Sequence, residues 1–245
     1  GYLNGNEALK EKIPGKRSQV DQNLREAAAK AEELESSLGH AADELNIIIS
    51  EWDGLKMEAI QISSAETFKR HTALLAKIQD HIGHVAEESN LIIDDAFDRT
   101  YLIDLLVNRI PGLTERMGQI RALGSGIIAR GGFKPGQEAR LNKLQAYAEI
   151  MSDGINHDLE GLFDVNKEME GSLRSVADSA KADLQNYLGK VGLILDAKFD
   201  QLDSSAYFEL ATSSINGSFA LYDDSAVELK NLLHANDHAA AHNRE

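Results

Sequence analysis

Apolar residues recur at steps of three and four along most of the chain, the spacing that gathers them on one face of an α-helix. Nowhere do apolar and polar residues alternate over the length of a strand, and no Asn-Gly turn joins two alternating stretches. The pattern therefore predicts an all-α fold. The expected helices cover residues 16–62, 65–92, 98–130, 136–163, 166–200 and 206–234.

The first expected helix is unusually long, and its apolar residues between Val20 and Trp52 follow a near-heptad spacing over the first half of the helix. At 1.5 Å per residue, a continuous helix over residues 16–62 would span about 70 Å, more than the diameter of a compact domain. Gly39 and Gly54 weaken it locally. The lengths favour an elongated antiparallel helical bundle of two stacked four-helix-bundle modules that share long helices. The expected modules are residues 55–170 and, joining both chain ends, residues 1–54 with 171–245.

The helix expected over residues 98–130 has a distinct start, middle and end. Asp98 is the expected N-cap, because its short side chain can accept hydrogen bonds from the free amides of the first turn. Pro111 lacks a backbone N–H and its ring clashes with the preceding turn, so the helix should kink or be interrupted there. Gly131, followed by Pro135, predicts the end of the helix.

Composition narrows the classes of function. A net charge of −15 argues against binding to nucleic acid or to an anionic membrane surface. The chain has no cysteine, which excludes disulfides, thiolate metal sites and a thiol nucleophile. No apolar run approaches the roughly 20 residues of a membrane span, and no signal peptide is present. We expect any contact with a membrane to be made through spans outside this sequence.

Catalytic and cofactor motifs are missing from the sequence. There is no phosphate-binding glycine loop, nucleophile elbow or zinc-binding His-Glu pair, so neither an enzyme nor a cofactor is expected. Three histidines, His234, His238 and His242, recur every four residues and would share one face of a continuous helix. They lie in an alanine-rich tail, where an incidental spacing is the simpler interpretation, and no metal site is expected.

Polar residues interrupt the apolar faces of the helices expected over residues 65–92 and 98–130, Asp98 and Arg121 among them. If buried, they must pair with one another or with a ligand. Arginine presents a planar fork that fits carboxylate or nitrate-like anions. Two interpretations stay open: a hydrogen-bond network that fixes helix register, or part of a small-molecule pocket between helices. The candidate ligand-binding residues are Arg70, Asn90, Tyr101, Asp104, Asn108 and Arg109.

Two stretches resemble a known group of receptors: residues 64–126, which begin SAETFKRH and end IRALGSG, and residues 206–233, AYFELATSSINGSFALYDDSAVELKNLL. They look like the extracytoplasmic sensory region of bacterial transmembrane receptors, chiefly methyl-accepting chemotaxis proteins and some sensor histidine kinases. The helix count is similar to the helical bimodular class, and the opening resembles the nitrate/nitrite-sensing helical domains. The nitrate-type pattern has an arginine-bearing segment before Tyr2 that is absent here, so the resemblance does not carry nitrate binding over. It also has a proline where this chain has Asp95.

The resemblance implies a periplasmic ligand-sensing domain of a transmembrane chemoreceptor in the inner membrane, a homodimer in the full-length receptor. Residues 55–170 would be membrane-distal, and the module of both chain ends membrane-proximal. A small molecule such as an organic anion, or a periplasmic binding protein, would shift the long helices between two arrangements, and displacement of the last helix would reach a cytoplasmic signalling module. The alternatives are the sensor domain of a histidine kinase and a ligand-free dimerisation or protein-docking module.

Overall fold

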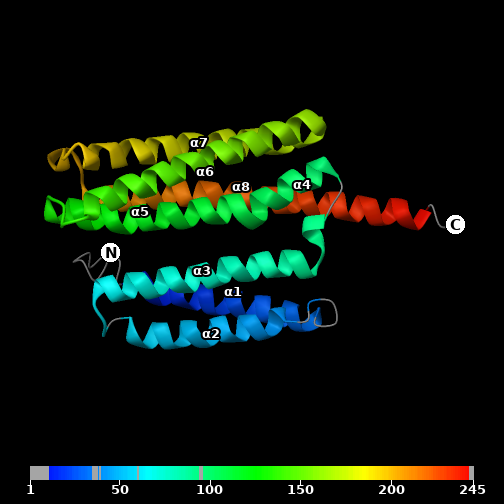
Figure 1. The fold of residues 1–245 in the computed structure, drawn as a ribbon, viewed down its shortest axis with the longest axis horizontal. Coiled ribbons are helices and arrows are strands. Elements are labelled where there is room, and N and C mark those ends of the chain that lie inside the picture. The colour runs from blue at the N-terminus through cyan, green and yellow to red at the C-terminus, as the bar shows by residue number, and fades with distance from the viewer. Residues whose placement is uncertain (1–10, 35–37, 39, 60, 94–95, 243–245) are drawn as a thin grey trace. The chain divides into compact units, whose positions relative to one another are not determined.

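The computed structural model describes residues 11–34, 38, 40–59, 61–93 and 96–242, and these residues form helices and connecting turns without a strand (Figure 1). The expected all-α fold is confirmed. The chain divides into two compact units, Gly1–Ile92 and Ile93–Glu245, called unit 1 and unit 2 below. These units do not coincide with the two modules expected from the sequence, and the membrane-proximal and membrane-distal parts stay a prediction. None of the described helices is long and apolar enough to cross a membrane.

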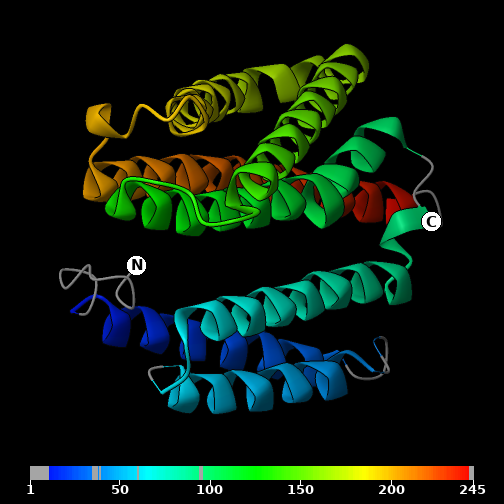
Figure 2. The same cartoon turned by 60° about the vertical axis from the view of Figure 1, so that its left-hand side comes forward.

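Unit 1 consists of α1 (Ile13–Glu33), α2 (Ala41–Glu58) and α3 (Ser64–Glu88), followed by the short 3₁₀-helix η3 (Leu91–Ile93) (Figure 2). The prediction of a single helix over residues 16–62 was wrong, because α1 ends at Glu33 and α2 folds back along it. The indole Nε1 of Trp52 donates a hydrogen bond to Asp21 Oδ1 at 2.7 Å, across the two antiparallel helices.

The core of unit 1 shows why the near-heptad seam was misleading. Ala31 of α1 packs with Leu38, Ala41 and Leu45 in one buried cluster. The same apolar residues that would line a long helix therefore close a helical hairpin. Farther along the chain, a second cluster joins the second half of α2 to α3. Its buried members are Ile48, Trp52, Leu55, Ala59 and Leu74.

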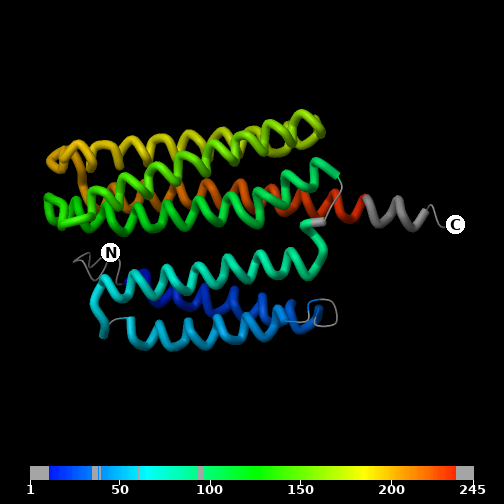
Figure 3. The backbone as a smooth tube through the Cα atoms, in the orientation of Figure 1, coloured from blue at the N-terminus to red at the C-terminus, as the bar shows by residue number. Residues whose placement is uncertain are grey.

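Unit 2 is an antiparallel four-helix bundle whose first rod is composite. That rod is followed by three long helices, each packed against the next, with the last returning to the first (Figure 3). No long helix is shared between the units in the described residues, since α3 ends at Glu88 and the next α-helix begins at Phe97. The elements are α4 (Phe97–Asp104), the π-helix η4 (Leu105–Arg109), α5 (Ile110–Arg130), α6 (Gln137–Val165), α7 (Lys167–Leu195), the 3₁₀-helix η5 (Phe199–Gln201) and α8 (Ser204–His242).

Local sequence explains where these helices begin and end. Gly131 closes α5 with φ of 68°, in the left-handed region that glycine tolerates, as its sequence predicted. Asn166 alone separates α6 from α7, and its side chain accepts a hydrogen bond from the backbone N–H of Glu168. The core contains fully buried Phe163 and Tyr187.

The composite first rod differs from the sequence prediction at both of its expected landmarks. Asp98 is not the N-cap: Ala96 holds that position, and Asp98 Oδ2 instead accepts a hydrogen bond from Asn166 Nδ2 at 3.0 Å. The interruption expected at Pro111 takes the form of one π turn just before it, in which the backbone N–H of Ile110 donates to Leu105 O. A π turn widens the helix and relieves the proline clash without ending the rod.

Candidate functional site

A cluster of hydrogen-bonded polar side chains lies at the π turn of unit 2. Asp104 Oδ1 accepts from Asn108 Nδ2 at 2.7 Å, and Asp104 Oδ2 accepts from Arg109 Nε, also at 2.7 Å. Asp158 of α6 joins from across the bundle, with its Oδ2 3.0 Å from the same Nε. We call Asp104, Asn108, Arg109 and Asp158 the Arg109 network. Three of the six candidate residues are thus brought together.

The pKa values of the two carboxyl groups in the network are shifted in opposite directions. Burial raises the pKa of Asp158, and the neighbouring Asp104 adds to the effect, although Arg109 opposes it. Burial also disfavours the ionised form of Asp104, but hydrogen bonds from Asn108 and Arg109 outweigh it and lower the pKa of Asp104. The surroundings therefore favour the ionised form at Asp104 and disfavour it at Asp158.

Two glycines of α6 let the first rod approach closely. A Cβ at Gly161 would lie 2.5 Å from Cζ of Tyr101, and a Cβ at Gly154 would lie 2.7 Å from Nη1 of Arg109. Tyr101 is half-buried in this contact. The candidate residues Tyr101 and Arg109 therefore both pack against α6, on two glycines that are seven residues apart.

The remaining two candidates lie elsewhere. Arg70, on α3 of unit 1, donates from Nη1 to Glu58 Oε2 at 2.5 Å, an ion pair that joins the end of α2 to α3. Asn90 follows α3 and adopts φ of 57°, a left-handed conformation that asparagine tolerates in turns. The six residues are therefore divided between the two units, and their common role in binding a ligand stays a prediction.

Arg121 of α5 differs from Arg70 and Arg109 in its contacts, which are with a hydroxyl group and an aromatic ring. Its side chain is half-buried against α8, where Nη1 donates to Thr212 Oγ1 at 2.8 Å and Cζ lies 4.7 Å from the centre of the Phe208 ring. Burial lowers the pKa of its guanidinium, although the two phenols of Tyr187 and Tyr207 and the charge of Glu209 oppose that effect. A desolvated arginine that donates to a hydroxyl group is a candidate anion-binding group.

Two buried tyrosines fix the helix face that carries Arg121. Tyr187 Oη donates to Met117 O at 3.1 Å, and Tyr207 Oη donates to Ile120 O at 3.2 Å. The two phenol oxygens lie 3.4 Å apart. Both backbone carbonyls belong to α5, so the tyrosines tie α7 and α8 to the turns that precede the arginine.

Unit 2 contains a small, partly open cavity of about 20 Å³. Its lining includes Ile110 and Leu113 of α5 and Ser218 of α8. A space of this size holds a single water molecule. This cavity is therefore too small to enclose the organic anion expected from the sequence.

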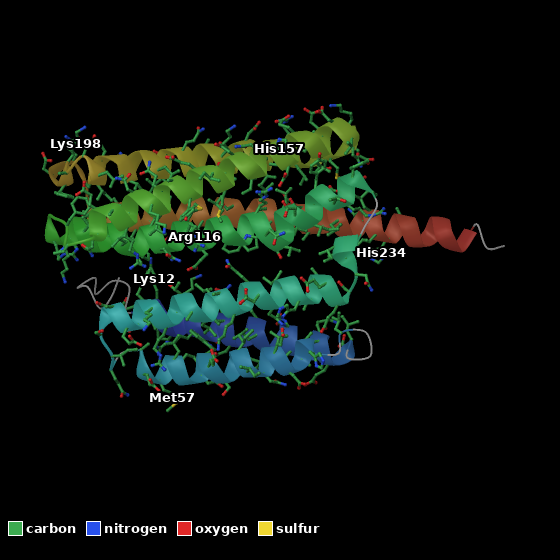
Figure 4. The ribbon with its side chains drawn as sticks, viewed as in Figure 1. Lys12, Met57, Arg116, His157, Lys198 and His234 are labelled. Atoms are coloured by element: carbon green, nitrogen blue, oxygen red, sulfur yellow. The ribbon has the colours of Figure 1, made fainter. Side chains whose placement is uncertain are left out.

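Histidines form no metal site in the part of the chain that the structure describes, where no group of three or more potential ligands converges. His234 lies on α8 with an exposed side chain (Figure 4), while the side chains of His238 and His242 lie outside the described residues. In unit 1, His81 and His84 instead share the carboxylate of Glu44, with Nδ1–oxygen distances of 2.9 and 2.8 Å.

The fold and the half-buried cation define the chain as an all-α helical-bundle protein with a candidate small-ligand site. The chain belongs to the family described as nitrate and nitrite sensing (NIT), which matches residues 1–230. Members are extracytoplasmic helical sensor domains, so the expected class of sensory domain is confirmed. No curated protein and no solved structure matches the chain.

Proposed function

We propose that the chain is the periplasmic ligand-sensing domain of a transmembrane chemoreceptor and that it binds a small inorganic oxyanion, with nitrate and nitrite as the first candidates. The carrying observation is Arg121, a half-buried guanidinium whose Nη1 donates to the hydroxyl of Thr212 and whose burial lowers its pKa. Family membership supports this class of ligand, although the sequence resemblance alone did not carry nitrate binding over.

The chemistry around Arg121 suits a small planar anion. A guanidinium offers parallel N–H donors in one plane, which match two oxygens of nitrate or nitrite. Thr212 Oγ1 donates its own proton to Phe208 O at 2.8 Å, so the guanidinium is the cationic donor at this position. The Phe208 ring under the guanidinium holds the cation in place without neutralising it.

Signal output in this proposal runs through α8. Arg121 lies on α5, whereas Phe208 and Thr212 lie on α8, so an anion bound there would change the contact between these two helices. The last buried side chain described on α8 is Leu229, yet α8 stays helical to His242 and extends beyond the rest of unit 2 (Figure 1). A displacement of α8 would thus be carried out of the bundle toward a signalling module.

Binding is tested by calorimetry and thermal unfolding of the 245-residue chain with sodium nitrate and sodium nitrite, against chloride, sulfate and small organic acids. A ligand that binds only the folded state at a hundred times its Kd adds about 2.7 kcal/mol of stability. Saturable binding of nitrate or nitrite, lost in Arg121→Met and retained in Arg116→Met, supports the proposal. Arg116 lies on the same helix and provides the matched loss of one positive charge (Figure 4).

Other outcomes separate the alternatives. Binding of an organic acid alone would refute the oxyanion proposal, and the receptor's output module would distinguish a chemoreceptor from a histidine kinase. A ligand-free docking module predicts no anion binding and a concentration-dependent dimer. Its sequence support is weakened, because seam residues such as Leu45, Ile48 and Trp52 are buried inside unit 1. Homodimerisation in the full receptor and recognition of a periplasmic binding protein stay proposals.

A further inference from the structure

The π turn joins Asp104 to a residue that a regular helix would carry away from it. In an α-helix, residues five apart point about 140° away from each other. Here Asp104 Oδ2 and Arg109 Nε, five residues apart, lie at 2.7 Å, because the Ile110 N–H reaches back five residues to Leu105 O. The Asp104–Arg109 pair is therefore specific to the π register.

Pro111 disfavours the alternative register. In a continuous α-helix, Val107 O would accept from the N–H of residue 111, which proline does not have, and the proline ring would clash with that carbonyl. The π turn is thus stabilised on its N-terminal side by the Asp104 carboxylate and on its C-terminal side by Pro111. Turns of this kind occur as single-turn insertions in α-helices, frequently at functional sites.

Docking of α4 on α6 depends on the same register. Tyr101 lies on Gly161 and Arg109 lies on Gly154, with the Arg109–Asp158 pair between them. Converting the π turn to α would rotate α4 by about 100° relative to α5. Tyr101 would then leave Gly161, and the Asp104–Arg109 pair would separate.

Two features near the π turn bear on this rotation of α4: a neighbouring cavity and the position of α4 in the chain. The partly open cavity adjoins Ile110 and Leu113, directly after the π turn, so side chains there are less tightly packed and have some space to move. α4 is also the first α-helix after the boundary between the units at Ile92 and Ile93. Any change transmitted along the chain from unit 1 enters the bundle through α4.

We propose that Leu105–Arg109 is a two-register switch, in which the π register docks α4 on α6 through the Arg109 network and the α register rotates α4 and releases it. Neither the identity of the ligand nor Arg121 enters this inference, so it goes beyond the proposed function and can fail independently of it. Arg109 is the latch, because its Nε contacts both Asp104 within the rod and Asp158 on α6.

Hydrogen exchange on the 245-residue chain tests the latch. Arg109→Gln should speed amide exchange in peptides covering residues 97–110, on the order of tenfold for the loss of about one such contact, and leave α7 unchanged. The matched control is Arg174→Gln, which removes an ion pair between α6 and α7 with Glu160 and should leave residues 97–110 unchanged. Unchanged exchange at 97–110 in Arg109→Gln, or an equal rise throughout unit 2, would overturn the latch.

A second variant tests the register itself. Pro111→Ala restores an N–H that can bond to Val107 O, so the α register becomes available. In the parent chain, Asp104→Asn should lower the urea midpoint of unit 2, because it weakens the pair with Arg109. In the Pro111→Ala background the same substitution should have a smaller effect, since the pair is separated in the molecules that adopt the α register. An equal loss in both backgrounds would overturn the two-register switch.

Discussion

Tyr207 lies so close to Gly124 that a Cβ at position 124 would be 2.4 Å from its phenol oxygen. That oxygen also donates to Ile120 O, one turn earlier on α5, so it cannot withdraw freely. We expect Gly124→Ala to lower the free energy of unfolding of unit 2 by about 2 kcal/mol, within the range for overpacked cores. Urea unfolding followed by circular dichroism measures this loss.

The control for that substitution is Gly118, on the same helix, where an added Cβ would meet nothing within 4 Å. Gly118→Ala should stabilise the chain by about 1 kcal/mol, because alanine is the better helix former. If both variants changed stability by the same amount and in the same direction, close contact with Tyr207 would not be the cause.

Arg121→Met should make the anion-free chain more stable, by about 1 kcal/mol, even though it removes two contacts. The side chain is half-buried, and burial outweighs the charge of Glu209 and lowers the pKa of the guanidinium, which reflects the cost of keeping the charge there. Methionine fills a similar volume against Phe208 without that charge. Thermal unfolding in a chloride-free, nitrate-free buffer gives the comparison, and a clear loss of stability would show that Arg121 is a structural residue.

Helix positions were predictable because their signals are local. Gly131 and Pro135 end α5 as expected, and Asn166 separates α6 from α7 close to the expected boundary. The α1–α2 hairpin was not predictable from the apolar seam, because Ala31, Leu38 and Leu45 keep one spacing whether the helix continues or folds back. Only long-range packing distinguishes the two arrangements.

The candidate site was predictable only where it is local in sequence. Asp104, Asn108 and Arg109 lie within one turn, whereas their partner Asp158 is 49 residues away from Arg109. A signal for Asp158 was present, since it falls in the buried phase of α6 beside Leu159. Arg121 carried the same signal in α5, next to buried Ile120, and was left out of the six candidates.

Asp158→Asn should stabilise unit 2 at pH 7 by about 1 kcal/mol. Burial raises the pKa of this carboxyl, so the folded chain holds the proton more tightly than the unfolded chain, and stability from this group grows as the pH falls through the folded pKa. Asparagine keeps an acceptor for Arg109 without the buried charge. Urea titrations at pH 7 and pH 4 should show the gain at pH 7 only.

Asp104→Asn is the contrasting variant, because hydrogen bonds lower the pKa of Asp104 and its ionised form stabilises the fold above the unfolded pKa. A loss of about 0.5 kcal/mol at pH 7 is expected for this partly exposed side chain. Should Asp158→Asn instead destabilise the chain at pH 7 as Asp104→Asn does, the charge of the network would lie on Asp158.

Unit 1 should lose stability as the pH rises above neutrality, through His84. The hydrogen bond to Glu44 raises the pKa of His84, and the charges of Glu44, Glu87 and Asp80 add to it. The folded state therefore binds the proton more tightly than the unfolded state. The resulting stability is complete below the unfolded value of about 6.5 and is lost as the pH rises through the higher folded pKa.

Trp52 reports on this directly, because it is the only tryptophan of the chain and is buried in the core of unit 1. Urea midpoints from its fluorescence should be lower at pH 8.5 than at pH 6, and His84→Gln should reduce that difference. His157→Gln, which replaces an exposed histidine on α6 of unit 2 (Figure 4), should leave the difference unchanged. If His84→Gln showed the same difference between the two midpoints as the parent chain, His84 would not be its origin. Protonation of His84 beside Glu44 would then contribute nothing to the stability of unit 1.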